Sequence, residues 1–339
     1  MGEQFKWNPS AERVGQMLRQ AVYMEDVVTL EHLLKQRADL EARDESGATP
    51  LHIAATQCKP GMVGWLLKQR SDLQARDGEG FSALTWACVK GHGPIIAMLL
   101  GAAADINEVT DSSGKTPLAI SAERGNFDSV LELLSRRASV ECANRDGSTA
   151  LMCAAHQSET QVVAYLLERQ SLVNAVDAGG WTALMYAVNA PVPPAAAGGE
   201  AAEKKVGIDG VMGKRSTTEL MLLHGADLNA QTADGLTPLI IAAGRDRPLS
   251  VKRLLEGRAQ VNMATAKGQS ALLMAAAHDF PQVCKALILA QAEVNHANER
   301  KDTPLSLAEK YGHKEVLELL RKAGAAEPKG KKAKGKKGK

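Results

Sequence analysis

The stretch GATPLHIAA at residues 47–55 decides how this sequence is interpreted. It joins a glycine, a Thr-Pro pair and a histidine, and Asp44 lies just upstream. A histidine near an aspartate is compatible with a catalytic or metal site, and equally with a structural role. Whether the stretch is unique or repeated separates these two interpretations.

The stretch is one of eight related segments. The others are GFSALTWAC from Gly80, GKTPLAISA from Gly114, GSTALMCAA from Gly147, GWTALMYAV from Gly180, GLTPLIIAA from Gly235, GQSALLMAA from Gly268 and KDTPLSLAE from Lys301. They start 33 or 34 residues apart, except for an interval of 55 residues between Gly180 and Gly235. A second apolar row keeps these intervals: Leu33, Leu66, Leu99, Leu133, Leu166, Met221, Leu254, Leu287 and Leu320. Two rows that share even the irregular intervals indicate a repeat protein.

Each repeat predicts a turn followed by two short helices. Asp-x-x-Gly is typical of a turn. Thr49-Pro50 is typical of a helix start, because Thr caps the first amides and Pro lacks an amide that needs a partner. The helix Leu-x-x-Ala-Ala then presents small residues, which allow a neighbouring repeat to approach closely. A second helix follows with apolar residues at helical spacing, as at Val162, Val163 and Leu166.

No single repeat can bury its apolar face, so the repeats must stack, and the end repeats need polar outer faces. Residues 11–43 keep the leucine row but lack the Thr-Pro signature, which predicts a capping repeat after an N-terminal extension at 1–10. The last repeat carries Lys310, Lys314, Arg321 and Lys322, as a solvated end requires. The predicted repeats are 44–76, 77–110, 111–143, 144–176, 177–231, 232–264, 265–297 and 298–324.

The period of 33, the TPLHxA signature, the paired leucines and GADLNA at 225–230 resemble the ankyrin repeat family over residues 11–324. The resemblance implies an all-α repeat solenoid of stacked helix-turn-helix units with β-hairpin or loop fingers. It implies a curved, non-enzymatic scaffold or adaptor that binds a partner protein through its concave face and fingers. It also implies that His52 hydrogen-bonds the backbone near the turn and braces adjacent fingers.

The basic charge of the chain is concentrated at one end. The net charge is +2, but PKGKKAKGKKGK at 328–339 holds seven lysines and no acid. Without it, 34 basic residues stand against 39 acidic ones, so the rest of the chain is about −5. We expect residues 325–339 to be a disordered tail. As an alternative function, we expect the tail to bind polyanions, either nucleic acid or an anionic membrane. The lysines that would do so are Lys331, Lys332, Lys334, Lys336 and Lys337. A nuclear address and a purely solubilising role are also open.

The 55-residue interval contains an insertion inside the repeat 177–231. Its 22 surplus residues are rich in Pro, Gly, Ala and Lys, which predicts a flexible loop at about 190–216. A tolerated insertion, a loop that contacts a partner, and a switch or processing site are three open interpretations.

The sequence predicts no catalytic, cofactor or metal site. Its histidines show no pair at metal-ligand spacing with a third ligand nearby. Its five cysteines lack CxxC spacing, and we interpret them as small buried residues in a reducing compartment. GVMGKRST at 210–217 lacks the spacing of a phosphate-binding loop. With no secretory signal and no transmembrane run visible, we expect a monomeric, cytoplasmic or nuclear protein.

The residue after each turn glycine is free to vary and is the candidate binding position. These residues are Ala48, Phe81, Lys115, Ser148, Trp181, Leu236, Gln269 and Asp302. Exposed Phe81, Trp181 and Leu236 are the predicted anchors for a partner protein, because aromatic side chains dominate binding hot spots. The predicted polar rim includes Lys115, Glu79, Arg145, Asp146 and Arg300. Alternatively, the apolar side chains pack against adjacent fingers or the insert. We expect Asp44, Asp77, Asp111 and Asp177 to accept hydrogen bonds from local backbone amides.

Overall fold

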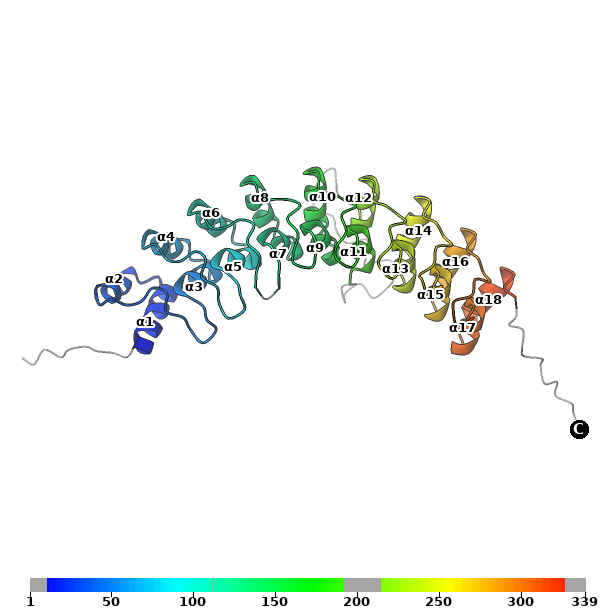
Figure 1. Cartoon of the computed structure of the whole chain (residues 1–339), viewed down its shortest axis with the longest axis horizontal. Coiled ribbons are helices and arrows are strands. Elements are labelled where there is room, and N and C mark those ends of the chain that lie inside the picture. The colour runs from blue at the N-terminus through cyan, green and yellow to red at the C-terminus, as the bar shows by residue number, and fades with distance from the viewer. Residues whose placement is uncertain (1–10, 112, 192–214, 327–339) are drawn as a thin grey trace, which may run out of the picture. The chain divides into compact units, whose positions relative to one another are not determined.

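The computed structural model describes residues 11–111, 113–191 and 215–326 (Figure 1). The chain divides into two compact units, Met1–Ser171 and Leu172–Lys339. We call them the N-terminal unit and the C-terminal unit and describe each by itself. The predicted insert at 190–216 and the predicted tail at 325–339 fall almost entirely outside the described residues, so both stay predictions.

Helices account for the regular secondary structure of the described residues. The N-terminal unit has α1 (Ala11–Met24), α2 (Val27–Lys35), α3 (Pro50–Thr56), α4 (Pro60–Lys68), α5 (Ala83–Lys90), α6 (Gly93–Gly101), α7 (Pro117–Glu123), α8 (Phe127–Ser135), α9 (Ala150–Gln157) and α10 (Thr160–Glu168). The C-terminal unit has α11 (Ala183–Asn189), α12 (Thr217–Leu223), α13 (Pro238–Gly244), α14 (Pro248–Glu256), α15 (Ala271–Ala277), α16 (Pro281–Leu289), α17 (Pro304–Tyr311) and α18 (Lys314–Lys322). In these ranges the extended backbone pairs only at isolated bridges, Val176 with Thr182 and Ala264 with Ser270. The predicted all-α class is confirmed.

The helices of each unit form two layers. In the N-terminal unit the inner helices α1, α3, α5, α7 and α9 pack in series, and the outer helices α4, α6, α8 and α10 form the second layer (Figure 1). In the C-terminal unit α11, α13, α15 and α17 are the inner helices, and α14, α16 and α18 pack in series outside them. Each repeat therefore contributes one inner helix and a second helix outside it, and α2 and α12 pack against the inner helices α1 and α11 of their own repeats.

Hydroxyl residues begin the inner helices, as the sequence predicts. Thr116 accepts the amide of Ala119 at 3.2 Å on its side-chain oxygen, and Pro117 occupies the first turn of α7. Ser82 does the same for the amide of Thr85 at 3.1 Å. These caps satisfy amides that have no partner within the helix.

Small residues form the contact between successive inner helices. Ala54 and Ala55 of α3 and Ala154 and Ala155 of α9 are all 0% exposed. Their size lets helix backbones approach within a closely packed core. The leucine row fills the space between the two layers, and Leu33, Leu66, Leu99, Leu133 and Leu166 are at most 1% exposed. The two rows of the sequence are thus the two halves of one core.

The first repeat does not present the uniformly polar surface expected of a cap. Tyr23 and Met24 at the end of α1 are 54% and 65% exposed, and Val28 of α2 is 79% exposed. Apolar side chains therefore interrupt this surface. In the last repeat the basic residues are exposed as expected: Lys310, Lys314, Arg321 and Lys322.

An asparagine after each of several outer helices ties its repeat to the next one. In the C-terminal unit the side-chain oxygen of Asn229 accepts the amide of Gln260 at 2.8 Å. That of Asn262 accepts the amide of Glu293 at 2.9 Å. Asn107 binds Ser139 in the same way in the N-terminal unit, at 3.1 Å. The asparagine of the GADxN turn is therefore a connector between repeats, because its oxygen replaces a backbone acceptor that the turn lacks.

Asn262→Ala removes one of these connectors and is expected to lower the free energy of unfolding by about 1 kcal/mol. Urea unfolding followed by circular dichroism measures the change. Gln260→Ala is the matched control, because it truncates an exposed polar side chain of the same turn and leaves the bond from its backbone amide to Asn229 in place. Equal midpoints for the two variants would contradict the connector role.

Candidate protein-binding surface

The loop between each outer helix and the next inner helix, which we call a finger loop, is shaped in several repeats by the aspartate three residues before its turn glycine. Asp77 Oδ1 accepts the amides of Glu79 at 3.0 Å and of Phe81 at 2.9 Å. Asp177 accepts the amide of Trp181 at 2.9 Å in the same way. The prediction that turn aspartates satisfy local amides is confirmed here. These bonds fix the backbone direction at the residue after the glycine.

The turn before Gly114 differs because the interval from Gly80 to Gly114 is 34 residues, and the extra residue lies within 108–111. Thr110 Oγ1, instead of Asp111, accepts the amide of Lys115 at 2.9 Å. Asp111 is exposed, and its carboxylate lies 3.7 Å from the guanidinium of Arg76. The expectation that Asp111 caps its own turn is therefore wrong, since the inserted residue shifts the register of the loop by one.

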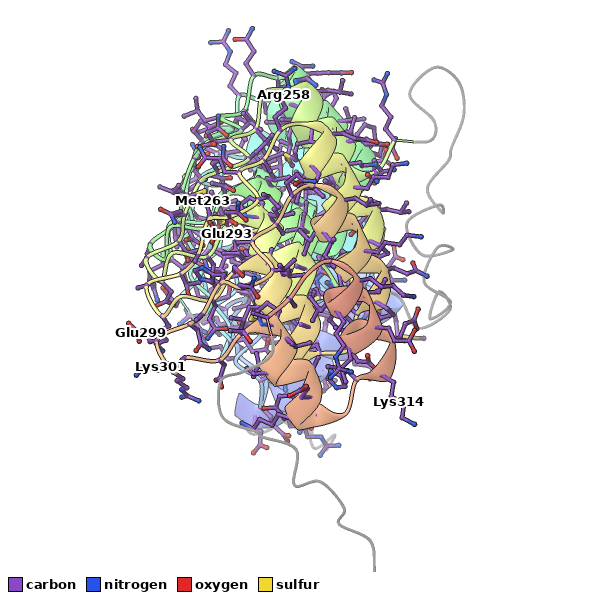
Figure 2. The ribbon with its side chains drawn as sticks, turned by 90° about the vertical axis from the view of Figure 1, so that its right-hand side faces the viewer. Arg258, Met263, Glu293, Glu299, Lys301 and Lys314 are labelled. Carbon is purple, nitrogen blue, oxygen red and sulfur yellow. The ribbon has the colours of Figure 1, made fainter. Side chains whose placement is uncertain are left out.

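Successive finger loops also bond to each other through their backbones. The amide of Gly78 donates to the carbonyl of Ser46 at 2.7 Å, and that of Arg145 donates to Gly114 at 2.7 Å. Glycine is required at this approach: Gly47 has φ +79°, and a Cβ there would lie 2.7 Å from the nitrogen of Gly78. Figure 2 shows Glu299 and Lys301 of the C-terminal unit at the loop tips, on the opposite side of the helices from Lys314.

His52 bridges two finger loops. Its Nδ1 accepts the hydroxyl of Thr49 at 2.8 Å and lies 3.2 Å from the Thr49 amide, while its Nε2 lies 2.9 Å from the carbonyl of Phe81. Only a neutral ring with its proton on Nε2 satisfies both sides. Burial lowers the pKa of His52 below its ordinary value of 6.5 and favours this form. The predicted bracing role of His52 is confirmed.

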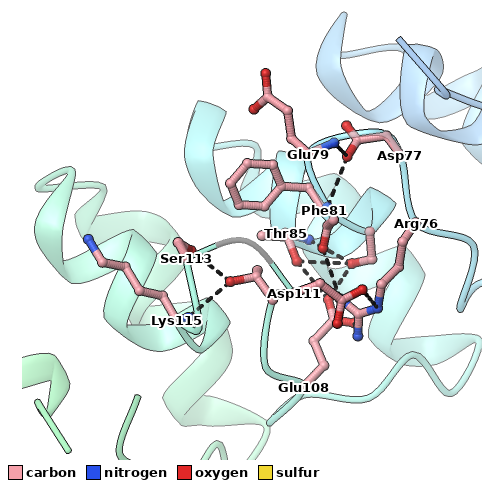
Figure 3. A network of polar contacts seen from close by, with 12 residues as sticks. Arg76, Asp77, Glu79, Phe81, Thr85, Glu108, Asp111, Ser113 and Lys115 are labelled. Atoms are coloured by element: carbon pink, nitrogen blue, oxygen red, sulfur yellow. Dashed lines mark hydrogen bonds and ion pairs between the residues drawn. The ribbon is translucent and has the colours of Figure 1, made fainter. Parts of the chain in front are cut away.

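The next repeat makes the same bridge with different residues (Figure 3). Thr85 occupies the position equivalent to His52, and its hydroxyl donates to Glu108 Oε1 at 2.7 Å. The Ser82 hydroxyl donates to the same oxygen, and Arg76 lies 3.3 Å from Oε2. The side chain of Glu108 is only 3% exposed. A buried carboxylate is tolerated here because both its oxygens have partners.

Phe81 packs against a tryptophan of its own inner helix. The Phe81 and Trp86 rings meet edge to face with centroids 5.3 Å apart. Trp86 Nε1 donates to Asp77 Oδ2 at 2.6 Å, so the aspartate that shapes the turn also orients the indole. Both rings are half-buried. Phe81 is thus a supported aromatic group with part of its surface in solvent.

Trp181 has the same support in the C-terminal unit. Its ring lies 5.3 Å from that of Tyr186, whose hydroxyl donates to Asp177 Oδ2 at 2.6 Å. Trp181 is half-buried. The two repeats share the pattern Asp, aromatic four residues later, and aromatic nine residues later. This pattern is visible in the sequence, but a prediction based only on the residue after each turn glycine does not include Trp86 and Tyr186.

The other predicted residues of the N-terminal unit lie on the same loops. Lys115 is half-buried, and its Nζ lies 2.5 Å from Glu123 Oε2. Arg145 and Asp146 are exposed, and the Arg145 guanidinium donates to the carbonyl of Asp111 at 3.0 Å. Glu79 is exposed and points away from Asp77 (Figure 3). Glu79, Phe81, Lys115, Arg145 and Asp146 therefore occupy three successive finger loops.

In the C-terminal unit, Leu236 is half-buried and Arg300 is exposed, each on a finger loop like that of Trp181. Lys331, Lys332, Lys334, Lys336 and Lys337 lie outside the described residues. The aromatic anchors thus fall in separate units, Phe81 in the N-terminal one and Trp181 in the C-terminal one. The assignment of these residues to a binding site stays a prediction.

The thiols of the core are unsuited to nucleophilic chemistry. Burial raises the pKa of Cys88 and of Cys284 to about 12, and that of Cys153 to about 11. These thiols are therefore protonated near neutral pH, whereas the thiolate is the reactive form. Among the residues described, no three His, Cys, Asp or Glu side chains gather as metal ligands. Nor is any helix in those ranges long and apolar enough to cross a membrane.

Comparison with known families identifies the repeat. The family model "Ankyrin repeats (3 copies)" matches residues 18–110, 59–144, 118–192, 211–298 and 250–332. These overlapping matches cover most of the chain, which therefore belongs to the ankyrin repeat family. Ankyrin repeats are generally protein–protein interaction modules. A search of curated proteins found no match.

The His52 bridge predicts a pH-dependent stability. At about pH 7.5, His52→Gln is expected to lower the free energy of unfolding by about 1 kcal/mol, because the bond to the next finger loop is lost. The pKa of folded His52 lies below the unfolded value, so its contribution is present above pH 6.5 and is lost as the pH falls below it. The difference between wild type and variant should therefore shrink at about pH 5.

Urea midpoints at both pH values measure this effect. His224→Gln is the control for replacing a histidine, because His224 is exposed. A destabilisation by His52→Gln that is equal at both pH values would show that the protonation of His52 does not govern the bridge.

Proposed function

We propose that this protein is a non-enzymatic scaffold or adaptor that binds a partner protein through its finger loops and the adjoining ends of its inner helices. The observation that supports this most is the pair of half-buried aromatic groups, Phe81 and Trp181, each held by a second ring and a turn aspartate. Aromatic side chains with restricted motion and partly exposed faces are effective binding anchors.

The finger loops are suited to recognition because they are ordered before a partner arrives. Side-chain caps and the bridge from His52 to Phe81 hold them to the helices. Backbone bonds such as Gly78 to Ser46 hold them to each other. A pre-ordered surface loses little conformational entropy on binding, which favours affinity at a given buried area. Variation at the exposed loop positions then sets the specificity.

The membership of the ankyrin repeat family supports a binding role over catalysis. The core thiols are protonated, and the buried His52 serves as a neutral hydrogen-bond bridge. Both observations also favour binding over catalysis. We also propose a cytoplasmic or nuclear location and a monomeric state, both from the sequence.

A second candidate function rests on the charge of residues 328–339, which include seven lysines and no acid. We propose that this segment binds polyanions such as nucleic acid or an anionic membrane, with the repeats in a secondary role. Each phosphate contact releases counterions, so binding should weaken steeply with salt. Filter binding of single-stranded RNA at rising salt, by the full chain and by a chain ending at residue 327, tests this. Equal binding by both chains would refute it.

Trp181→Ala tests the principal proposal. Truncating an anchor of this kind typically costs about 2 kcal/mol, or roughly thirtyfold in affinity, so partner capture should be largely lost. Capture is measured by affinity purification with quantitative mass spectrometry, and stability by thermal unfolding. Trp65→Ala is the matched control, because Trp65 is also half-buried but lies on the outer helix α4.

The two measurements together decide the role of Trp181. Lost capture with a nearly unchanged melting temperature supports the proposal, provided that Trp65→Ala keeps its partners. Unchanged capture by Trp181→Ala refutes the assignment of Trp181 as an anchor. A large fall in the melting temperature would instead make Trp181 part of the fold.

A further inference from the structure

A small cavity in the N-terminal unit lies where the second and third repeats meet. It has a volume of about 180 Å³ and is lined by Ala48, His52, Ile53, Thr56, Asp77 and Trp86 among others. One wall comes from α3 and its finger loop, and the other from Trp86 of α5 and Asp77 of the next loop. The cavity therefore exists only because two repeats stack, and its lining extends from the finger loops to the end of α3 at Thr56.

The indole of Trp86 is held so that it forms a wall of this cavity. Its Nε1 donates to Asp77 Oδ2 at 2.6 Å, and Phe81 contacts it edge to face. A negative acceptor at the indole nitrogen polarises the ring and makes its faces more negative. Aromatic faces attract cations, and tryptophan is the strongest of them. Lys90 already lies 6.0 Å from the centroid of this ring, in the range of such an attraction.

The charge around the cavity is acidic. Residues 11–171 contain 21 acidic and 16 basic residues, whereas residues 172–326 contain 16 and 17. The excess negative charge of the repeats is therefore in the N-terminal unit. Asp77 lies in the cavity wall, while Glu45 and Glu79 are exposed on the two finger loops that border it. A cationic ligand is favoured by this field, and an anionic one is repelled.

The arginines of these finger loops neutralise only part of the negative charge around the cavity. The Arg43 guanidinium donates to the carbonyls of Gly47, at 3.1 Å, and Arg76. The Arg76 guanidinium donates to the carbonyl of Gly80 at 3.2 Å and to Glu108. The Arg43 guanidinium is thus directed at the loop backbone, and that of Arg76 at the loop backbone and the buried Glu108 carboxylate. Glu45 and Glu79 have no ion pair among the described residues.

We propose that this cavity receives the side chain of a lysine or arginine from an extended basic segment of the partner protein. The cation lies over the face of Trp86, near Asp77 and within the field of Glu45 and Glu79. The aliphatic stem of the side chain packs against Ile53 and Ala48. This inference rests on the proposed function and names the chemistry of the partner. Lys90 repels the incoming cation and moderates its affinity.

Peptide binding to the full chain tests the proposal. The probe is a fluorescein-labelled peptide of alternating lysine and glycine, and the matched control peptide has glutamine in place of lysine. Fluorescence anisotropy gives the dissociation constants. Trp86→Ile is expected to weaken binding of the lysine peptide by roughly tenfold, through loss of the cation–π contact. Ile53 and Ile120 occupy the equivalent position in neighbouring repeats, so isoleucine suits the fold.

Two charge variants test the same site without altering its core. Glu45→Gln with Glu79→Gln should weaken binding severalfold, and Lys90→Gln should strengthen it. Trp65→Ile is the matched control, because Trp65 is half-buried on the outer helix α4, and it should leave peptide binding unchanged. Equal binding of lysine and glutamine peptides, or unchanged binding by Trp86→Ile, would overturn the proposal.

The basic tail of the chain itself is the competing occupant. If a chain ending at residue 327 binds the lysine peptide much more tightly than the full chain does, the tail fills the cavity, and the assignment to a partner protein is overturned. Equal binding by the two chains supports the partner. If the cavity proposal is overturned, the scaffold proposal still stands as long as Trp181→Ala abolishes partner capture. The two proposals can therefore fail separately.

Discussion

The contact between inner helices of successive repeats is the constraint on which the rest of this structure depends. Alanines such as Ala54, Ala55, Ala154 and Ala155 are completely buried there. A larger side chain at this contact would force the helices apart, because protein interiors are close-packed. The distance between the helices also sets the distance between the finger loops. The bonds that cross from one loop to the next are possible only at this spacing.

The polar bridges between repeats vary in chemistry while their geometry is conserved along the stack. His52 reaches the carbonyl of Phe81, Thr85 reaches the carboxylate of Glu108, and Thr116 donates its amide to Asn144 at 2.9 Å. In each case a buried polar group near the start of an inner helix finds its partner in the following finger loop. The requirement is that buried polar groups be satisfied, and different residue pairs meet it.

On the candidate binding surface, one turn aspartate bonds both to the backbone of its turn and to an aromatic side chain. Asp77 shapes the turn with one carboxylate oxygen and orients Trp86 with the other, and Asp177 does so for Tyr186. The aromatic residue of the finger then rests against this fixed ring. Phe81 and Trp181 are therefore not fully exposed anchors, because each is half-buried and rests against a ring of its own repeat. A ring held in this way loses little conformational freedom when a ligand contacts it.

The sequence by itself determined the repeat, its helix pairs and the bracing role of His52, because these follow from local spacing and capping chemistry that recur along the chain. Positions such as Phe81 and Trp181 could also be identified, since they depart from the shared pattern. Only the tertiary structure decided the shifted turn at Asp111, the burial of Glu108 and the cavity beside Trp86. The burial of Glu108 and the cavity depend on side chains that are 23 or more residues apart in sequence and meet only when one repeat stacks on the next. The turn at Asp111 depends on which of two neighbouring residues, Thr110 or Asp111, accepts the amide of Lys115.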